Sequence, residues 1–126
     1  MTTSKAYTDL EQSKKLAKIL PLESADMDYI PVINIEGEYC INVNTWDNDH
    51  VIDEGWIPCW SLAALLSILP TIDDRNAEFC KDIRFDKWHI YYHGTASLPI
   101  IDTEKYENLV DACYEMILKL NEMKML

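Results

Sequence analysis

Four cysteines and three histidines are the residues of this 126-residue chain best suited to nucleophilic or metal chemistry. No two cysteines have the CxxC spacing of a zinc or redox site, so we expect reduced and mostly buried thiols. Cys59 lies between Pro58 and Trp60 at the predicted entrance of a helix. A helix N-terminus lowers a thiol pKa, which would favour a nucleophile. Two apolar neighbours fit a buried structural thiol better, and we predict no catalytic residue.

Two of the histidines, His89 and His93, share one face of a predicted strand. At about 3.3 Å per residue, they are roughly 13 Å apart, which is too far for one metal ion. A helix would bring them together, but the composition of Trp88–His93 is typical of a strand. We therefore expect exposed or hydrogen-bonded histidines, and we predict neither a metal nor a cofactor.

Carboxylates flanked by two tryptophans form the candidate binding site. Its residues are Trp46, Asp47, Asp49, Asp53, Glu54 and Trp56. The acids resemble a calcium loop, but an EF-hand needs an oxygen ligand and a glycine where this chain has Val51 and Ile52. Aromatic side chains rimmed by charge are typical anchors of protein interfaces. In the alternative reading, both tryptophans cover the core beneath a solvated acidic loop.

The net charge of −11 comes from one part of the chain. Residues 21–74 include eleven Asp and Glu and no Lys or Arg, whereas the remainder holds eleven residues of each sign. Such a surface would repel nucleic acid, because phosphate binding needs cations, and it would attract a basic protein. The alternative is that the acidity only keeps a small protein soluble.

No motif of a known enzyme class is present. The three glycines stand far apart at positions 37, 55 and 94, so there is no glycine-rich phosphate loop. GxSxG, HExxH and Walker patterns are also missing. The N-terminal residues Met1–Tyr7 are polar rather than leader-like, and the central apolar helix of about ten residues is too short to span a bilayer. We therefore expect a cytoplasmic protein without a membrane partner.

The apolar run Gly55–Pro70 predicts a short helix that enters the core. Ser61 is a suitable N-cap, and Pro70 ends the helix because proline lacks an amide proton. Leucines at the i, i+3, i+4 and i+7 spacing mark one buried face; they are Leu62, Leu65, Leu66 and Leu69.

Two more helices are predicted near the ends of the chain. Thr8, with Glu11 three residues later, fits a capping box, and Pro21 ends this first helix. Asn108 is a suitable cap for the last helix, whose apolar face continues to Met123.

Alternating apolar and polar residues predict two hairpins. The strands and turns, in chain order, are Tyr29–Ile35, Glu36–Gly37, Glu38–Asn44, Glu78–Phe85, Asp86–Lys87 and Trp88–His93. We therefore predict a single domain, 1–126, of the α+β class. It would have an antiparallel sheet of about four strands with three helices packed on it, in the order α-β-β-α-β-β-α.

Several blocks of the sequence carry a resemblance. They are Tyr7–Ala17, Ile19–Met27, Ile57–Leu66 and Val110–Leu120. These blocks are similar to a family of short uncharacterised proteins from gut anaerobic bacteria, their mobile elements and phages. The blocks contain no catalytic motif, so the resemblance implies no activity, cofactor or site residue. It implies a cytoplasmic setting, and it favours a small binding protein over a metabolic enzyme.

These observations predict an acidic, non-enzymatic protein-interaction module. Its segment Met27–Gly55, anchored by Trp46 and Trp56, would dock on a basic protein. A protein of a phage or mobile element could use such charge in place of phosphates to modulate a host nucleic-acid-binding protein. One alternative is a small-ligand-binding protein or enzyme with a pocket beside the central helix. Another is self-association as a homodimer, through a hairpin edge or the C-terminal Met123 and Met125.

Overall fold

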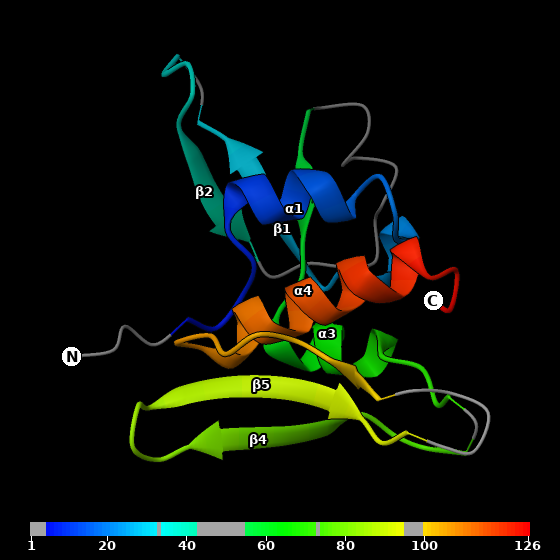
Figure 1. Cartoon of the computed structure of the whole chain (residues 1–126). Coiled ribbons are helices and arrows are strands. Elements are labelled where there is room, and N and C mark those ends of the chain that lie inside the picture. Colours follow the sequence, from blue (N-terminus) through cyan, green and yellow to red (C-terminus); the bar gives the residue numbers. More distant parts are fainter. Residues whose placement is uncertain (1–4, 33, 43–54, 73, 95–99) are drawn as a thin grey trace. The chain divides into compact units, whose positions relative to one another are not determined.

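A computed structural model describes residues 5–32, 34–42, 55–72, 74–94 and 100–126. Its described part is an α+β structure with three α-helices and two three-stranded antiparallel sheets (Figure 1). Contacts group these residues into two compact units. The N-terminal unit comprises the described residues of Tyr7–Ala64, and the C-terminal unit comprises those of Met1–Ala6 and Leu65–Leu126.

The N-terminal unit packs a helix against a three-stranded sheet. Its elements are α1 (Leu10–Leu16), a short 3-10 helix (Leu22–Ser24), β1 (Met27–Pro31), β2 (Tyr39–Asn42) and β3 (Ile57–Cys59). The strand order is β2-β1-β3, so the first hairpin of the chain forms one side of the sheet and β3 forms the other. Helix α1 lies against β3.

The first helix begins one residue later than the sequence predicts. Asp9, not Thr8, is the N-cap, because its carboxylate accepts a hydrogen bond from the Gln12 amide while the Gln12 side chain accepts one from the Asp9 amide. This is a capping box with the expected chemistry in a shifted register. The Thr8 side chain is fully buried instead, within a polar network that also includes Cys59.

Helix α3 (Leu62–Ile68) follows the prediction for the central apolar run. The Ser61 hydroxyl accepts a hydrogen bond from the Ala64 amide at 3.1 Å, as an N-cap should, and the helix ends before Pro70. Leu65 is fully buried, whereas the other three leucines of the predicted face are only half-buried. The face is therefore less completely covered than its spacing indicated.

The C-terminal unit packs a long helix on the second sheet. Its elements are β4 (Glu78–Asp82), β5 (Lys87–Tyr92), β6 (Ile101–Asp102) and α4 (Leu109–Glu122), with strand order β4-β5-β6. Ile90 and Tyr92 are buried on the face of β5 that α4 covers. Asn108 caps α4, because its side chain accepts a hydrogen bond from the Asp111 amide at 2.8 Å, and this prediction is confirmed.

The predicted single sheet of about four strands is wrong in its details, although the α+β class is confirmed. The described strands form two sheets of three, and the order α-β-β-α-β-β-α lacks β3 and β6. These strands have three and two residues, which is too short for an alternating pattern to be recognised. The sequence placed Ile57–Cys59 at the entrance of the central helix. Across the described ranges, no helix has the length and apolar character needed to cross a membrane.

Candidate functional site

The predicted binding site lies mostly outside the described residues. Of its six members, the structure describes Trp56, which is half-buried immediately before β3. The other five lie outside the described residues: Trp46, Asp47, Asp49, Asp53 and Glu54. The aromatic-acidic loop as a whole therefore stays a prediction, and the candidate site has to be built from described surfaces.

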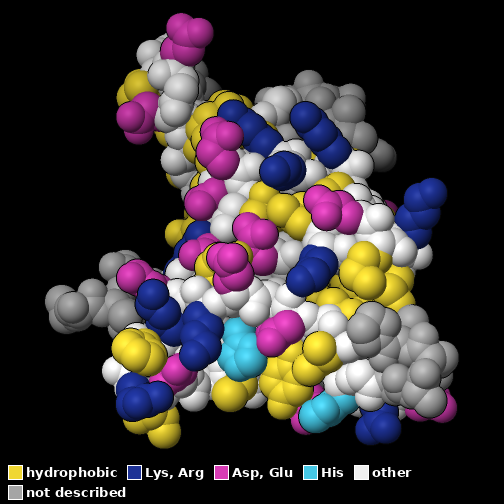
Figure 2. All heavy atoms as spheres, viewed as in Figure 1, with side chains coloured by type: hydrophobic (Ala, Val, Ile, Leu, Met, Phe, Trp, Pro, Cys, Tyr) yellow, Lys and Arg dark blue, Asp and Glu magenta, His cyan; other side chains and the backbone are white. Residues whose placement is uncertain are grey.

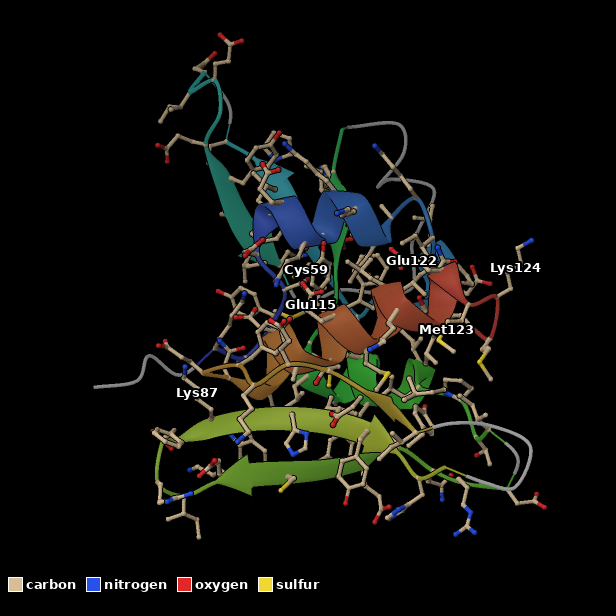
Figure 3. All side chains as sticks on the ribbon, viewed as in Figure 1. Cys59, Lys87, Glu115, Glu122, Met123 and Lys124 are labelled. Atoms are coloured by element: carbon tan, nitrogen blue, oxygen red, sulfur yellow. The ribbon has the colours of Figure 1, made fainter. Side chains whose placement is uncertain are left out.

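Cys59 has the environment of a structural thiol. It is fully buried at the end of β3 (Figure 3), with its Sγ 3.6 Å from the Thr8 hydroxyl and 3.4 Å from the Thr8 carbonyl. Burial raises the pKa of the Cys59 thiol, so little of the nucleophilic thiolate exists near neutral pH. This position is unsuited to nucleophilic catalysis.

The remaining cysteines divide by exposure. Cys113 on α4 is buried, and burial raises its pKa to about 12. Cys40 and Cys80 are exposed, so the prediction of mostly buried thiols is wrong for two of the four. Both exposed thiols are on strands. Alternation in the sequence separates the two faces of a strand but does not show which face is buried. Exposure at these positions could not be distinguished from burial in the sequence.

A row of aromatic rings crosses the outer face of β5, opposite α4. His89 stacks on Tyr91 with ring centroids 5.5 Å apart, and Tyr91 meets His93 edge-on at 5.2 Å. The His89 Nδ1 atom lies 2.9 Å from an Asp102 carboxylate oxygen on β6, and the His93 ring pairs with Glu78 on β4. The two histidines share one strand face as the sequence predicted, and each has its own carboxylate.

Among the described residues, this row is not part of a three-ligand metal cluster. Cys80 is the register partner of His89 across β4 and β5, which places a thiol on the same face. Within the described ranges, however, no three His, Cys, Asp or Glu side chains are close enough to share a metal ion. The negative charge of Glu78 raises the pKa of the Tyr91 hydroxyl, which therefore stays protonated and polar. The arrangement is a polar aromatic surface on an open sheet face.

The turn of the β4–β5 hairpin carries exposed apolar and basic side chains, which sequence reasoning missed. We call Lys81–Lys87 together with Lys105 the basic tip. Ile83 is 89% exposed and Phe85 is 62% exposed. The Arg84 guanidinium lies 5.7 Å from the Phe85 ring centroid, and the Lys105 ammonium lies 6.0 Å from it. Figure 2 shows hydrophobic and basic side chains together at this end of the hairpin, at the lower left.

The turn of the β1–β2 hairpin carries the opposite charge. We call Pro31, Val32 and Asn34–Tyr39 the acidic tip; these residues line an open hollow of about 510 Å³. The chain reverses because Asn34 and Gly37 adopt positive φ angles of 68° and 84°. Backbone hydrogen bonds from Val32 N to Glu38 O and from Glu38 N to Ile35 O hold the turn.

The acidic tip presents an apolar residue among carboxylates. Ile35 is 53% exposed, and the neighbouring Glu36 and Glu38 are also exposed. The ion pairs seen in the described part of the chain use carboxylates outside residues 21–74. Glu36 and Glu38 therefore have no cationic partner among the described residues, and their charges face solvent. Figure 2 shows acidic side chains at the upper left, at the end of the β1–β2 hairpin.

Comparison with protein-family models, with curated proteins and with solved structures finds no match. The resemblance to proteins of gut bacteria, mobile elements and phages therefore stays a prediction.

Proposed function

We propose that this chain is a non-enzymatic binding protein that docks its acidic tip on a basic, partly apolar surface of another protein. The observation that supports this function is the exposed Ile35 next to Glu36 and Glu38, two carboxylates without a cationic partner among the described residues, at an open hollow. An apolar anchor inside a charged rim is the usual composition of a protein interface. The tip falls within the predicted docking segment Met27–Gly55.

The electrostatic environment of the tip favours a cationic partner. Residues 21–74 contain no Lys or Arg, so no internal cation from this segment competes for the carboxylates. Uncompensated charge of one sign accelerates encounter with a surface of the opposite sign and repels surfaces of the same sign. A basic protein is therefore favoured over nucleic acid as the partner.

The proposed setting is the cytoplasm, where the four cysteines would stay reduced. If the chain comes from a phage or mobile element, the partner would be a host protein. A pocket beside Leu62–Ile68 for a small ligand remains the alternative function. The hollow described at the acidic tip is lined by other residues and does not test that alternative.

A pull-down from bacterial lysate tests the proposed function. The immobilised chain should retain basic proteins at about 50 mM salt and release most of them at about 300 mM, because salt screens exposed charges. The double variant Glu36→Gln/Glu38→Gln should lose this retention.

The matched control for this pull-down is Glu104→Gln/Glu107→Gln, which removes the same charge from exposed positions in the C-terminal unit. This control should retain the same proteins as the unmodified chain. Equal retention by both double variants, or retention that does not respond to salt, would contradict docking through the acidic tip.

A further inference from the structure

The basic tip exposes more apolar surface than a solvated turn requires. Ile83 and Phe85 are the two most exposed large apolar side chains in the described part of the chain. They are separated by one residue in the turn after β4, so they occupy one small surface. Exposed apolar groups rimmed by polar ones mark interaction sites more often than scattered single residues do.

The charges of the basic tip are only partly compensated. Lys81 pairs with Asp86 at 2.9 Å, and Lys105 pairs with Asp82 at 2.7 Å. Two other cations of the tip, Arg84 and Lys87, have no carboxylate partner in the described part of the chain. Figure 3 labels Lys87 at the start of β5, next to this turn. The tip thus presents two free positive charges around an apolar pair.

The acidic tip is complementary to the basic tip in both charge and polarity. Next to Ile35 it offers two carboxylates without a cationic partner among the described residues, Glu36 and Glu38, and these line an open hollow together with Val32. The hollow of about 510 Å³ is within the range of about 300–1,000 Å³ typical of ligand sites, so it can accept an isoleucine or phenylalanine side chain. Two anions beside a hollow of mixed polar and apolar lining thus face two cations and an apolar pair.

We infer that the acidic tip of one copy of this chain binds the basic tip of a second copy. The inference rests on the proposed function, because it identifies the basic partner of the acidic tip as another molecule of the same protein. The two surfaces differ, so the contact is head-to-tail rather than isologous. Such contacts build rings, in which every tip is used, or open chains, which keep one acidic and one basic tip free at their ends.

The contact should be weak and sensitive to salt. Each tip is a single hairpin turn, so the buried area falls below the roughly 1,200 Å² of a stable interface. Glu36, Glu38 and Arg84 are exposed and Lys87 is half-buried, so ions of the solvent screen their charges. The protein should therefore be a monomer when dilute and should associate progressively with concentration.

Sedimentation velocity measures this association. Between about 10 µM and about 1 mM protein at about 50 mM salt, the weight-average mass should rise at least about twofold above the monomer value of 14.7 kDa. At about 500 mM salt the rise should disappear. A mass of 14.7 kDa throughout the concentration series would overturn the inference.

Charge reversal assigns the association to the two tips. Arg84→Glu/Lys87→Glu leaves two acidic tips, and Glu36→Lys/Glu38→Lys leaves two basic tips. Each double variant alone should sediment as a monomer, whereas an equimolar mixture of the two should associate again, because acidic tips then meet basic tips. Association of either variant alone at the unmodified level, or a monomeric mixture, would overturn the inference.

Two control variants separate tip effects from net charge. Arg75→Glu/Lys124→Glu and Glu23→Lys/Glu122→Lys make the same charge changes at exposed positions outside both tips. Both controls should associate like the unmodified chain; loss of association in them would assign the effect to net charge. Circular dichroism establishes that every variant is folded.

The pull-down separates failure of this inference from failure of the proposed function. A chain that is monomeric at every concentration but retains basic lysate proteins through Glu36 and Glu38 overturns self-association and leaves the proposed function standing. A chain that neither self-associates nor retains such proteins overturns both.

Discussion

At the scale of single residues, the structure separates reactive from unreactive cysteines. Cys40 and Cys80 are exposed, whereas Cys59 and Cys113 are buried with raised thiol pKa values. A thiol reagent at about pH 8 should therefore modify two cysteines quickly in the folded protein and all four in urea, because only thiolates with solvent access react. The variant Cys40→Ser/Cys80→Ser should show no fast phase. A fast third thiol in the unmodified protein would contradict the buried positions.

Asp28 is a buried carboxylate whose ionisation affects stability. Its side chain is 5% exposed on β1, and burial raises its pKa from 3.8 to about 6. Between these values, the folded protein holds a proton that the unfolded chain has released. The carboxylate therefore lowers stability as pH rises from about 4 to 6, by up to about 3 kcal/mol, and this loss persists at higher pH.

Replacing this carboxylate with an amide should remove the pH-dependent penalty. In urea unfolding, Asp28→Asn should be more stable than the unmodified protein at about pH 8, and the difference should shrink toward about pH 4. Glu23→Gln, an exposed carboxylate in the same unit, should behave like the unmodified protein at both pH values. A constant difference between Asp28→Asn and the unmodified protein would show that the effect has another cause.

At the scale of elements, the Asp26 carboxylate, just before β1, holds the start of helix α3 in place. Asp26 accepts hydrogen bonds from the Ser61 amide at 2.8 Å and from the Ser61 hydroxyl, while that hydroxyl caps α3 by accepting from the Ala64 amide. Asp26→Ala should cost about 1.5–3 kcal/mol in urea unfolding, because it removes two charge-assisted hydrogen bonds.

Two further variants test whether the loss of stability in Asp26→Ala comes from the N-cap of α3. Ser61→Ala should cost about 1 kcal/mol, as loss of an N-cap side chain usually does. Glu23→Ala, at an exposed position nearby in the chain, should stay within about 0.5 kcal/mol of the unmodified protein. Equal stability of Asp26→Ala and Glu23→Ala would show that the Asp26 carboxylate does not support the helix.

The sequence predicted the elements that have clear boundary residues. Pro70 and Asn108 mark ends of α3 and α4 because each has one strong local effect on a helix. The short strands β3 and β6 have no such boundary residue. They are strands because they pair with β1 and β5, and a local sequence pattern does not reveal that pairing. Thr8 and Asp9 are both good caps, so the sequence alone could not decide between them.

The tips illustrate why surface sites are harder to predict than helices. Ile35, Ile83 and Phe85 continue an alternating pattern, which predicts strand residues at these positions. In the structure, Ile83–Asp86 form a turn and Asp86 adopts a positive φ of 52°, so the second hairpin reverses earlier than expected. The charge asymmetry pointed to the acidic segment, but overall charge could not identify which carboxylates lack partners.

At the scale of the whole molecule, the uneven charge should make stability depend on salt. The sequence between Tyr7 and Ala64 contains eleven Asp and Glu but only three Lys, all of them within residues 14–18. Like charges held on one folded unit repel one another, and the unfolded chain relieves this by expanding. Added salt screens the repulsion more than it weakens the few exposed ion pairs.

Sodium chloride should therefore stabilise the protein. Raising it from about 20 mM to about 500 mM should increase the free energy of unfolding in urea by about 1 kcal/mol. The triple variant Glu23→Gln/Glu36→Gln/Glu38→Gln should show a smaller increase, because it removes charge from the crowded unit. Glu104→Gln/Glu107→Gln/Glu122→Gln removes the same charge from the C-terminal unit, where cations are more numerous, and should respond to salt much like the unmodified protein. Lower stability at high salt would mean that attractive pairs outweigh the repulsion, and it would contradict this prediction.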